Sequence, residues 1–370
     1  MRILHVITSG EHGGAQAHVA EVVTQLQASG IECIVACGPG GWLQSELNGR
    51  VRVVEVPALR RAISLWSDLH SVWSLIQLAR GADVVHTHSA KAGFVGRVAA
   101  ILAGRPFVHT SHGSFLAEPM SGVRRAILRL AERSVAGRTA HLFVLSQVDA
   151  DLLHRERLYL RVPTSVIRVP TQRMRSPERR WTPPSGAPVI VAVANLYRNK
   201  AVDLLIAAFV EVRRQVDGVS LTIVGDGPER DRLAAQAAAA GGTAIRFAGR
   251  LEDPTETMLA GRVFVLSSRK EGVPLALLEA LALGMPSVAT AVGGVPEHVR
   301  PDEAILVAPD ATALARGISD LIRDPDRATD LGRHGQQAAE RYVAAATIDP
   351  LIAAYRGAVD GRIPRYTRSQ

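Results

Sequence analysis

Two glutamates, Glu271 and Glu279, stand before and within one short apolar segment of the chain. The segment begins at Pro274 and is followed by Gly284, residue types that favour the first position of a helix and the position just beyond its end. We therefore expect a helix over residues 274–283. Glu271 would then lie in the loop that leads into this helix, and Glu279 would lie on its body.

The start of such a helix could bind an anion, because its first N–H groups have no partner inside the helix and the macrodipole is positive there. Carboxylates would repel a phosphate, but they accept hydrogen bonds from hydroxyl groups. This combination indicates a ligand that carries both sugar hydroxyls and phosphate. The residues expected around it are Glu271, Gly272, Val273, Pro274, Leu275 and Glu279.

Two basic residues, Arg198 and Lys200, occupy a similar place earlier in the chain, after a strand-like segment that ends near Asn195. Apolar residues at helical spacing follow them, from Val202 to Phe209. Lysine supplies a point charge and arginine a planar set of donors, a combination that suits a diphosphate. A merely basic helix start is the weaker alternative, since the helix dipole disfavours cations there. We interpret these residues as a diphosphate clamp.

Gly13 and Gly14 stand between the first strand-like segment and a helix that we expect to reach residue 29. Glycines at this place let backbone N–H groups approach a phosphate closely. A plain turn between a strand and a helix explains the pair about as well. Because the pattern is not Gly-x-Gly-x-x-Gly, it argues against a dehydrogenase.

Four histidines, His86, His88, His109 and His112, lie in or directly after two further strand-like segments. Alternate residues of a strand share one face, so His86 and His88 would point to the same side. No cysteine or acidic residue is spaced to complete a metal site, and we expect no bound metal. His112 would contact a ligand at the end of its strand, whereas His86 or His109 would belong to the core.

The chain of 370 residues is long enough for two domains, and its 47% hydrophobic content is typical of a globular protein. Short β-rich segments alternate with helical patterns throughout, which predicts an α/β fold with parallel sheets. In the first half we expect strands at residues 2–8, 31–37, 51–56, 83–87, 106–110, 141–146 and 164–169. In the second half we expect them at residues 189–194, 220–224, 244–248, 262–267, 287–290 and 304–307.

A proline-rich segment at residues 176–188 is the best candidate for a linker. We therefore expect a first domain over residues 1–175 and a second over residues 189–345. Residues 346–370 would form a C-terminal helix that returns to the first domain. Open α/β sheets bind ligands at the carboxyl ends of their strands, so the site should be built from the loops that follow strands.

The net charge of +8 originates in the first half of the chain. Residues 1–180 contain 22 Lys and Arg against 13 Asp and Glu, whereas residues 181–370 contain 21 against 22. This asymmetry indicates that the first half meets an anionic partner, such as a phospholipid surface, or is a solvated surface. Few aromatic residues lie between the arginines, which argues against a nucleic-acid partner.

An amphipathic helix is expected over residues 120–135, with Val123, Ile127 and Leu130 on one face and arginines elsewhere. A helix of this kind can lie on an anionic membrane. We favour the alternative, in which it is a surface helix packed on its own sheet.

Cys33 and Cys37 lie in a strand-like segment, which predicts buried thiols and no disulfide or zinc site. The apolar start of the chain is too short for a signal peptide. Residues 272–295 contain Glu279 and Pro286, and a central carboxylate is costly in a bilayer. We expect a cytoplasmic protein, with peripheral contact to the inner face of an anionic membrane through its basic first domain.

Taken in order along the chain, these motifs resemble the GT-B glycosyltransferases of family 4, also called glycosyltransferase group 1. The resemblance is strongest to bacterial members that build exopolysaccharides or lipid-linked glycans, and it extends over almost the whole chain. Besides the glycine pair, the basic pair and the two glutamates, four segments carry it: residues 86–93, 109–113, 225–228 (Gly-Asp-Gly-Pro) and 293–297 (Gly-Gly-Val-Pro-Glu).

The resemblance implies two Rossmann-like domains that face each other across a cleft, the first binding an acceptor and the second a nucleotide sugar. It implies retaining transfer of a hexose-type sugar, with UDP as the expected nucleotide, to a glycan, lipid-linked or small-molecule acceptor. The departing phosphate would take the proton of the acceptor hydroxyl, so the protein would contribute positioning and charge. No cofactor or metal would be required.

The resemblance also implies roles for individual residues. Glu271 and His112 would be catalytic, close to the transferred sugar, and Glu279 would accept hydrogen bonds from the ribose hydroxyls. His88 and Lys91 would contact the acceptor. The donor-binding residues would be Gly13, Gly14, Asn195, Arg198, Lys200, Gly272, Val273, Pro274, Leu275 and Glu279.

Two positions depart from the family pattern. The family usually has arginine where this chain has Asn195, and usually has glycine directly after the lysine, where this chain has Ala201. Either Arg198 replaces the missing cation or phosphate binding is weaker. Three alternative functions stay open: a nucleotide-sugar 2-epimerase, a GDP-mannose-dependent mannosyltransferase, and a non-catalytic scaffold on a membrane surface.

Overall fold

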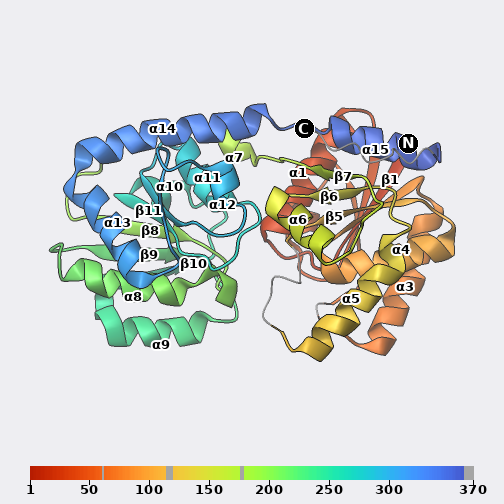
Figure 1. Ribbon diagram of the computed structural model, residues 1–370, viewed down its shortest axis with the longest axis horizontal. Helices are drawn as coiled ribbons and strands as arrows, with labels where there is room; N and C mark the ends of the chain where they lie inside the picture. The colour runs from red at the N-terminus through yellow and green to blue at the C-terminus, as the bar shows by residue number, and fades with distance from the viewer. Residues whose placement is uncertain (61, 114–119, 176–178, 362–370) are drawn as a thin grey trace. The chain divides into compact units, whose positions relative to one another are not determined.

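The computed structural model describes residues 1–60, 62–113, 120–175 and 179–361, and its contacts divide the chain into two units (Figure 1). The first unit comprises Met1–Val169 together with the C-terminal segment from Ala346, and the second comprises Pro170–Ala345. Among the described residues, no helix combines the length and the apolar character that crossing a bilayer requires.

The first unit is built on a seven-stranded sheet whose neighbouring strands are all parallel. The strand order is β3-β2-β1-β4-β5-β6-β7, and every strand predicted in the first half of the sequence is present. The strands are β1 (Arg2–Ile7), β2 (Glu32–Cys37), β3 (Arg52–Glu55), β4 (Val84–His88), β5 (Phe107–Ser111), β6 (Leu142–Val144) and β7 (Thr164–Val166).

Alternate residues of β1 divide between two cores, because successive side chains of a strand point to opposite faces. Ile3 and Ile7 pack with α1 and α15, whereas Leu4 and Val6 pack with α3 and α4. Both faces of the sheet are therefore covered, as in a doubly wound fold. The helices of this unit are α1 (Gly14–Ala28), α2 (Trp42–Glu46), α3 (Leu65–Arg80), α4 (Ala90–Ala103), α5 (Gly122–Ala136), α6 (Gln147–Arg155) and α15 (Asp349–Val359).

The amphipathic helix α5 contacts α4, but it does not do so through its apolar face. Its buried side chains include Glu132 and Val135. Val123, Ile127 and Leu130 are 73%, 63% and 72% exposed, so the favoured expectation of an ordinarily packed surface helix is wrong for these residues. The apolar pattern of α5 faces away from the unit to which the helix belongs.

The second unit is built on a six-stranded sheet, again with all neighbouring strands parallel. Its order is β10-β9-β8-β11-β12-β13, and it contains every strand predicted in the second half of the sequence. The strands are β8 (Val189–Val193), β9 (Ser220–Val224), β10 (Ile245–Gly249), β11 (Val263–Leu266), β12 (Ser287–Thr290) and β13 (Ile305–Val307).

Helices cover both faces of the second sheet as well, because its strands also divide between two cores. Ile190 and Val265 pack with α8 and α13, whereas Val191 and Phe264 pack with α11 and α14. The helical elements are α7 (Gln172–Arg175), the 3₁₀ turn η2 (Arg198–Lys200), α8 (Val202–Arg213), α9 (Arg230–Gly241), the 3₁₀ turn η3 (Gly242–Ala244), α10 (Thr255–Leu259), α11 (Leu275–Ala282), α12 (Val295–His298), α13 (Ala311–Arg323) and α14 (Pro325–Ala344).

The division between the units falls slightly earlier than the domain boundary expected at residue 175. The short helix α7 contacts α11 and α14 and belongs to the second unit. Trp181, in the expected linker, is buried, and its indole N–H donates to the carbonyl of Gly261 at 2.7 Å. Residues 176–178 of that linker and residues 362–370 of the expected C-terminal helix lie outside the described residues.

Each sheet has one place where the strand order reverses, between β1 and β4 in the first and between β8 and β11 in the second. At such a point the two neighbouring strands send their connections to opposite faces, which leaves a crevice at their carboxyl ends. The basic pair follows β8 and Glu271 follows β11. The topology therefore brings these sequence motifs to the switch point of the second sheet.

Candidate functional site

Lys200 and Glu271 meet at the switch point of the second sheet. The Nζ atom of Lys200 donates to Oε1 of Glu271 at 2.6 Å. The side chain of Glu271 is 5% exposed and that of Lys200 is 27% exposed. A carboxylate at this depth needs a charged partner, and the lysine supplies it while keeping part of its surface accessible.

Three hydroxyl groups that sequence reasoning missed hold the loops around this ion pair. Ser268 Oγ donates to the same carboxylate oxygen of Glu271 at 2.5 Å, and Ser267 Oγ donates to the carbonyl of Lys200 at 3.0 Å. Thr290 Oγ1 in turn donates to the carbonyl of Ser268 at 2.6 Å. The two serines lie directly after β11 and just before Glu271, and that position is the signal that could have identified them.

Gly293 and Gly294 support the backbone of Glu271 from the loop after β12. Gly293 has a φ of 53°, and a Cβ atom there would lie 2.0 Å from the carbonyl oxygen of Glu271. The N–H of Gly294 donates to that oxygen at 3.1 Å. Only glycine allows this approach, so the Gly-Gly motif has a physical role in fixing the loop that carries Glu271.

The loop that carries Asn195 rests on the Gly-Asp-Gly-Pro turn in a comparable way. Gly225 has a φ of 132°, and a Cβ atom there would lie 2.0 Å from the carbonyl oxygen of Ala194. The N–H of Leu196 donates to the carbonyl of Asp226 at 2.9 Å. The turn thereby fixes the backbone on both sides of Asn195.

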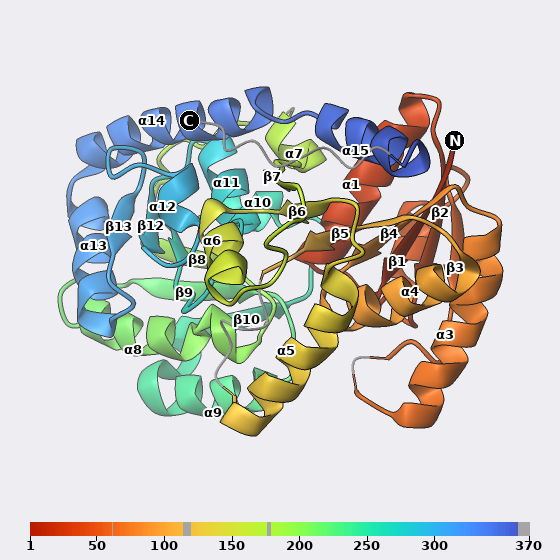
Figure 2. The ribbon, with the colours of Figure 1, turned by 45° about the vertical axis from the view of Figure 1, so that its right-hand side comes forward.

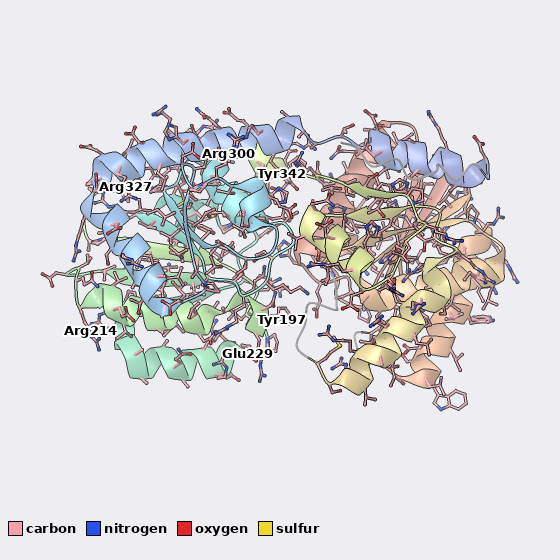
Figure 3. The ribbon with its side chains drawn as sticks, in the orientation of Figure 1. Tyr197, Arg214, Glu229, Arg300, Arg327 and Tyr342 are labelled. Carbon is pink, nitrogen blue, oxygen red and sulfur yellow. The ribbon has the colours of Figure 1, made fainter. Side chains whose placement is uncertain are left out.

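Arg198 does not share the partner of Lys200. Its Nε atom lies 3.2 Å from Oε1 of Glu229, and its side chain is 86% exposed. Arg232 also bonds to Glu229, at 2.7 Å, and these guanidinium groups hold the pKa of that carboxyl below its usual value, Arg232 more than Arg198. Figure 3 labels Glu229 at the edge of the second unit, next to Tyr197. The two members of the expected clamp therefore lie on the same 3₁₀ turn but bond to different acids.

Arg269 is a further basic residue at this edge that sequence reasoning missed. It bonds to both carboxylate oxygens of Asp203 at 2.8 Å and holds the pKa of that carboxyl below its usual value. Its backbone N–H donates to the carbonyl of Asn199 at 2.8 Å, which ties the loop after β11 to η2. An open hollow lies among the charged side chains Arg198, Asp203, Glu229, Arg232 and Arg269.

Ala201 shows why the family prefers glycine after the lysine. The residue has φ 49° and ψ 40°, in the left-handed region, and it is fully buried. An L-residue in this conformation brings its Cβ atom close to the backbone. Alanine at position 201, where the family usually has glycine, therefore keeps the left-handed backbone conformation and adds strain at the junction of η2 and α8.

The helix expected over residues 274–283 is α11, with Pro274 at its N-cap and Gly284 beyond its end at a φ of 83°. Pro274 is buried and Gly272, Val273 and Leu275 are half-buried, in the segment that leads from Glu271 into the first turn.

Glu279 lies on α11 and has partners of its own, separate from those of Glu271. It accepts a hydrogen bond from Thr171 at 2.7 Å, and Arg173 lies 3.6 Å away. Burial raises the pKa of Glu279 above its usual value, and Arg173 and Thr171 oppose this shift. Glu271 in the loop and Glu279 on the helix therefore have separate polar partners, and this separation agrees with the different roles expected for them.

In the first unit, His112, His88 and His5 form a hydrogen-bonded chain. His88 shares a hydrogen bond of 3.2 Å with His112 through Nδ1 and one of 3.1 Å with His5 through Nε2. Burial lowers the pKa of His88 and His112 well below the usual value, and lowers that of His5 to about 3. The ring of His18 lies edge-on to His112 at 4.8 Å, and burial lowers its pKa to about 4. These rings are therefore neutral near pH 7.

His86 belongs to the core of the first unit, as the sequence predicted for either His86 or His109. Its Nδ1 atom lies 2.6 Å from the hydroxyl of Tyr355 on α15, and its Nε2 atom lies 2.7 Å from Oγ1 of Thr110. His5, His86 and His88 place ring nitrogens within 4.8 Å of one another, which is the nearest approach to a metal-ligand set among the described residues. Five of their six ring nitrogens have hydrogen-bond partners, and the sixth, Nε2 of His5, is buried and has none among the described residues.

Lys91 is held by α3 and the segment that precedes it. Its Nζ atom lies 2.6 Å from Asp68 on α3 and also donates to the carbonyl of Ala62. The side chain of Lys91 is only 14% exposed. Its expected role in acceptor binding stays a prediction.

Gly13 and Gly14 lie where the sequence predicted them, at the start of α1. Gly13 is the N-cap with a φ of −174°, an extended conformation open to any residue, and Gly14 is exposed in the first turn. The backbone conformation of Gly13 therefore does not require glycine. The assignment of both residues to phosphate stays a prediction.

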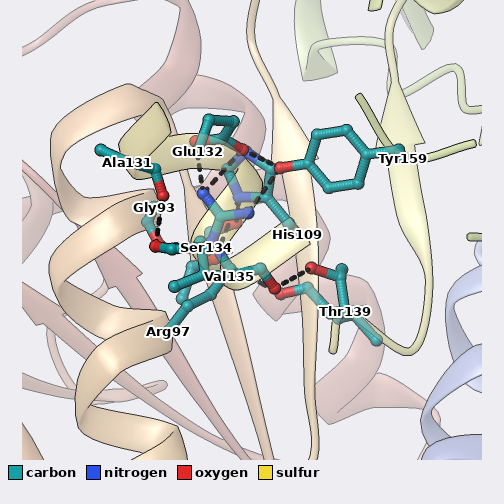
Figure 4. A network of polar contacts seen from close by, with 11 residues as sticks. Gly93, Arg97, His109, Ala131, Glu132, Ser134, Val135, Thr139 and Tyr159 are labelled. Carbon is teal, nitrogen blue, oxygen red and sulfur yellow. Dashed lines mark hydrogen bonds and ion pairs between the residues drawn. The ribbon is translucent and has the colours of Figure 1, made fainter. Parts of the chain in front are cut away.

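A buried polar network beside the histidines fixes α5 on α4 (Figure 4). Arg97 Nη2 bonds to both carboxylate oxygens of Glu132 at 2.8 Å, and the hydroxyl of Tyr159 bonds to both residues. Gly93 leaves room for the ring of His109, because a Cβ atom at residue 93 would lie 2.6 Å from Cε1 of that ring. The ion pair therefore determines which side of α5 faces inward.

Comparison with known proteins gives two family matches. Residues 176–338 match the family described as glycosyl transferases group 1, and residues 13–170 match the glycosyl transferase 4-like domain. The two matches follow one another along the chain and correspond to the second and the first unit.

Individual relatives resemble nearly the whole chain. The 2-deoxystreptamine N-acetyl-D-glucosaminyltransferase of Streptomyces fradiae is 30% identical over 89% of this chain and 89% of its own. The UDP-Gal:alpha-D-GlcNAc-diphosphoundecaprenol alpha-1,3-galactosyltransferase of Escherichia coli is 28% identical over 80% of each chain. The structure of Anabaena HepE in complex with UDP and glucose has a TM-score of 0.80 at 22% identity and covers 95% of this chain and 98% of its own, which shows a shared fold.

Proposed function

The chain belongs to the group 1 glycosyltransferases and has the GT-B fold, and we propose that it transfers a hexose-type sugar from a nucleotide diphosphate sugar to an acceptor hydroxyl. The proposed reaction retains the configuration at the anomeric carbon. The observation that carries the proposal is the contact between Lys200 and Glu271 at the switch point of the second sheet.

Lys200 and Glu271 have complementary chemistry for such a donor. A lysine ammonium has three N–H donors, so Lys200 can keep its bond to Glu271 and still donate to a phosphate oxygen. The buried carboxylate of Glu271, whose position the lysine and Ser268 fix, would accept hydrogen bonds from the hydroxyls of the sugar. Glu279, farther along α11, would accept them from the ribose.

The proposed chemistry needs no protein nucleophile and no metal. The bond between the anomeric carbon and the phosphate oxygen breaks, and the departing phosphate takes the proton of the acceptor hydroxyl as the new glycosidic bond forms. Lys200 and the positive end of the α11 dipole would stabilise the negative charge that develops on the phosphate. The neutral ring of His112 would donate or accept a hydrogen bond to the transferred sugar or the acceptor. His88 is fully buried and both of its ring nitrogens bond to His5 and His112, so it would hold the ring of His112 in position rather than contact the acceptor itself.

We propose UDP as the nucleotide and a glycan, lipid-linked or small-molecule acceptor. The name of the Escherichia coli relative specifies a UDP-sugar and a lipid-linked acceptor, and the HepE structure contains UDP. A lipid-linked acceptor would place the enzyme on the inner face of an anionic membrane, and the basic first half of the chain supports this placement.

A panel of nucleotides tests the donor. A ligand that binds the folded state raises the melting temperature by mass action, so UDP and a UDP-sugar should raise it more than GDP, ADP and their sugars. The product anomer, determined by NMR, then tests retention. A larger rise in melting temperature with GDP-mannose than with the UDP ligands would show that the proposed donor is wrong. A product with inverted anomeric configuration would overturn the proposed mechanism.

A further inference from the structure

Helix α3 carries large apolar side chains that point away from the first unit. Trp66, Leu69 and Trp73 are 82%, 54% and 62% exposed. They are three and four residues apart, so they form one stripe along the helix. The opposite side of α3, which includes Leu75 and Ala79, is buried. The sequence prediction did not single out this stripe.

Helix α5 carries a second outward stripe of the same kind, formed by Val123, Ile127 and Leu130. These three residues lie on the side of the helix opposite Glu132, because nine residues correspond to two and a half helical turns from Val123. Glu132 is fixed inward by its paired hydrogen bonds to the buried Arg97. The outward direction of the apolar stripe therefore follows from a specific buried ion pair.

The acidic residue of each helix is turned inward. Glu132 is the carboxylate of α5 and pairs with Arg97, and Asp68 is the carboxylate of α3 and pairs with Lys91 at 2.6 Å. Both partners, Arg97 and Lys91, belong to α4, which lies between the two helices. The outward sides of α3 and α5 therefore present no carboxylate of these two helices.

Arginines flank the stripe on α5. Arg124 and Arg133 lie to either side of it and are exposed, whereas Arg125 and Arg129 lie toward the side of Glu132 and pair with Glu156 at 3.9 and 3.1 Å. The outward side of α5 therefore combines apolar groups with positive charge. Both views of the ribbon show α3 and α5 with their N-terminal ends at the same lower edge of the first unit (Figures 1 and 2).

We propose that this surface, the α3–α5 face, binds a bilayer with anionic headgroups. The α3–α5 face is defined by Trp66, Leu69, Trp73, Val123, Ile127 and Leu130. Tryptophan is suited to the boundary between headgroups and acyl chains, and arginine bonds to lipid phosphate. The inference rests on the proposed function, since a lipid-linked acceptor would be presented at that boundary.

Charge distinguishes a membrane from a second copy of the chain as the occupant. Two α3–α5 faces in contact would bring the arginines of one α5 helix close to those of the other, and like charges at an interface oppose association. An anionic bilayer satisfies the same arginines and buries the same apolar side chains. The charge of the face therefore favours lipid.

The test measures binding of the full chain to vesicles of phosphatidylcholine with and without phosphatidylglycerol, at low and high salt. We expect binding to the phosphatidylglycerol vesicles, weakened by salt because the arginine contacts are screened. The double variants Trp66→Ser/Trp73→Ser and Ile127→Ser/Leu130→Ser should each reduce the partition coefficient at least about tenfold, since two large apolar side chains are lost from the bilayer. All four side chains are exposed, so neither variant should disturb folding.

Val359→Ser is the control, because Val359 is 51% exposed and belongs to α15, a helix that Figure 1 shows at the upper edge of the same unit, away from the lower ends of α3 and α5. It should bind vesicles as the wild type does. The proposal is overturned if both double variants bind like the wild type, if the wild type does not bind, or if the substitutions instead turn a dimer into a monomer. Glu271→Ala should still bind vesicles and Trp66→Ser/Trp73→Ser should still bind UDP, so this proposal and the proposed function fail separately.

Discussion

Lys200 and Glu271 are 71 residues apart in sequence and are joined by a 2.6 Å ion pair between the loops that follow β8 and β11. The pair combines a cation whose side chain is 27% exposed with a carboxylate that is 5% exposed. This is the arrangement that a donor site needs, since the cation can reach a phosphate while the carboxylate is held in a defined position.

Lys200→Ala should weaken binding of UDP by about 1.5–3 kcal/mol, because a charge-assisted contact to the diphosphate is lost. Isothermal titration calorimetry measures the effect. Arg246→Ala, at an exposed position of β10, is the matched control and should leave the affinity unchanged. Equal UDP affinity in Lys200→Ala and the wild type would remove Lys200 from the phosphate site.

Glu279→Ala should weaken binding of UDP but not of pyrophosphate, because pyrophosphate lacks the ribose whose hydroxyls this residue is proposed to bind. Lys200→Ala should weaken binding of both. The comparison separates the two ends of the nucleotide by calorimetry. Weaker pyrophosphate binding in Glu279→Ala would show that the substitution disturbs the site as a whole.

Ala201→Gly should change the free energy of unfolding by less than about 1 kcal/mol. Relief of the left-handed strain, about 1–2 kcal/mol, offsets the lost methyl contacts and the greater entropy of glycine in the unfolded chain. Ala208→Gly is the control, since Ala208 is equally buried but lies in the body of α8, and it should destabilise by about 1 kcal/mol or more. Chemical denaturation measures both variants, and an equal loss of stability would contradict the strain at Ala201.

The first unit should lose stability as the pH falls below about 6.5. His5 and His18 have folded-state pKa values of about 3 and about 4, whereas the unfolded chain protonates near 6.5, so the unfolded state binds more protons at pH 5. Each of the two residues should lower the free energy of unfolding by about 2 kcal/mol at pH 5. Denaturation of the wild type and of a His5→Gln/His18→Gln variant at pH 7 and pH 5 measures the effect. A variant with the same pH dependence as the wild type would show that these histidines do not control it.

Much of the fold could be predicted from the sequence because its signals are local. Runs of β-rich residues gave every strand, and Pro274 and Gly284 gave α11 to within a residue at each end. The glycines at 225 and 293 could be recognised as motifs. Their physical reason, close approach to the backbone at Ala194 and Glu271, appears only in three dimensions.

The features that could not be predicted depend on pairs that are distant in sequence. The apolar face of α5 turns outward because Arg97 holds Glu132 on the other side, and nothing within α5 specifies that pair. The chain of histidines arises because β1 and β4 are neighbours, which sets His5 opposite His86. The different acid partners of Arg198 and Lys200 likewise depend on which loop follows each neighbouring strand.

The role of the Lys200–Glu271 pair is tested most directly by the activity of Glu271→Ala, measured as transfer of labelled sugar from the donor that the nucleotide panel identifies. Near-total loss of transfer is expected, with far-UV circular dichroism and UDP binding close to those of the wild type, because Glu271 positions the sugar. Transfer at the wild-type rate by a folded Glu271→Ala protein would contradict the proposed role of the Lys200–Glu271 pair.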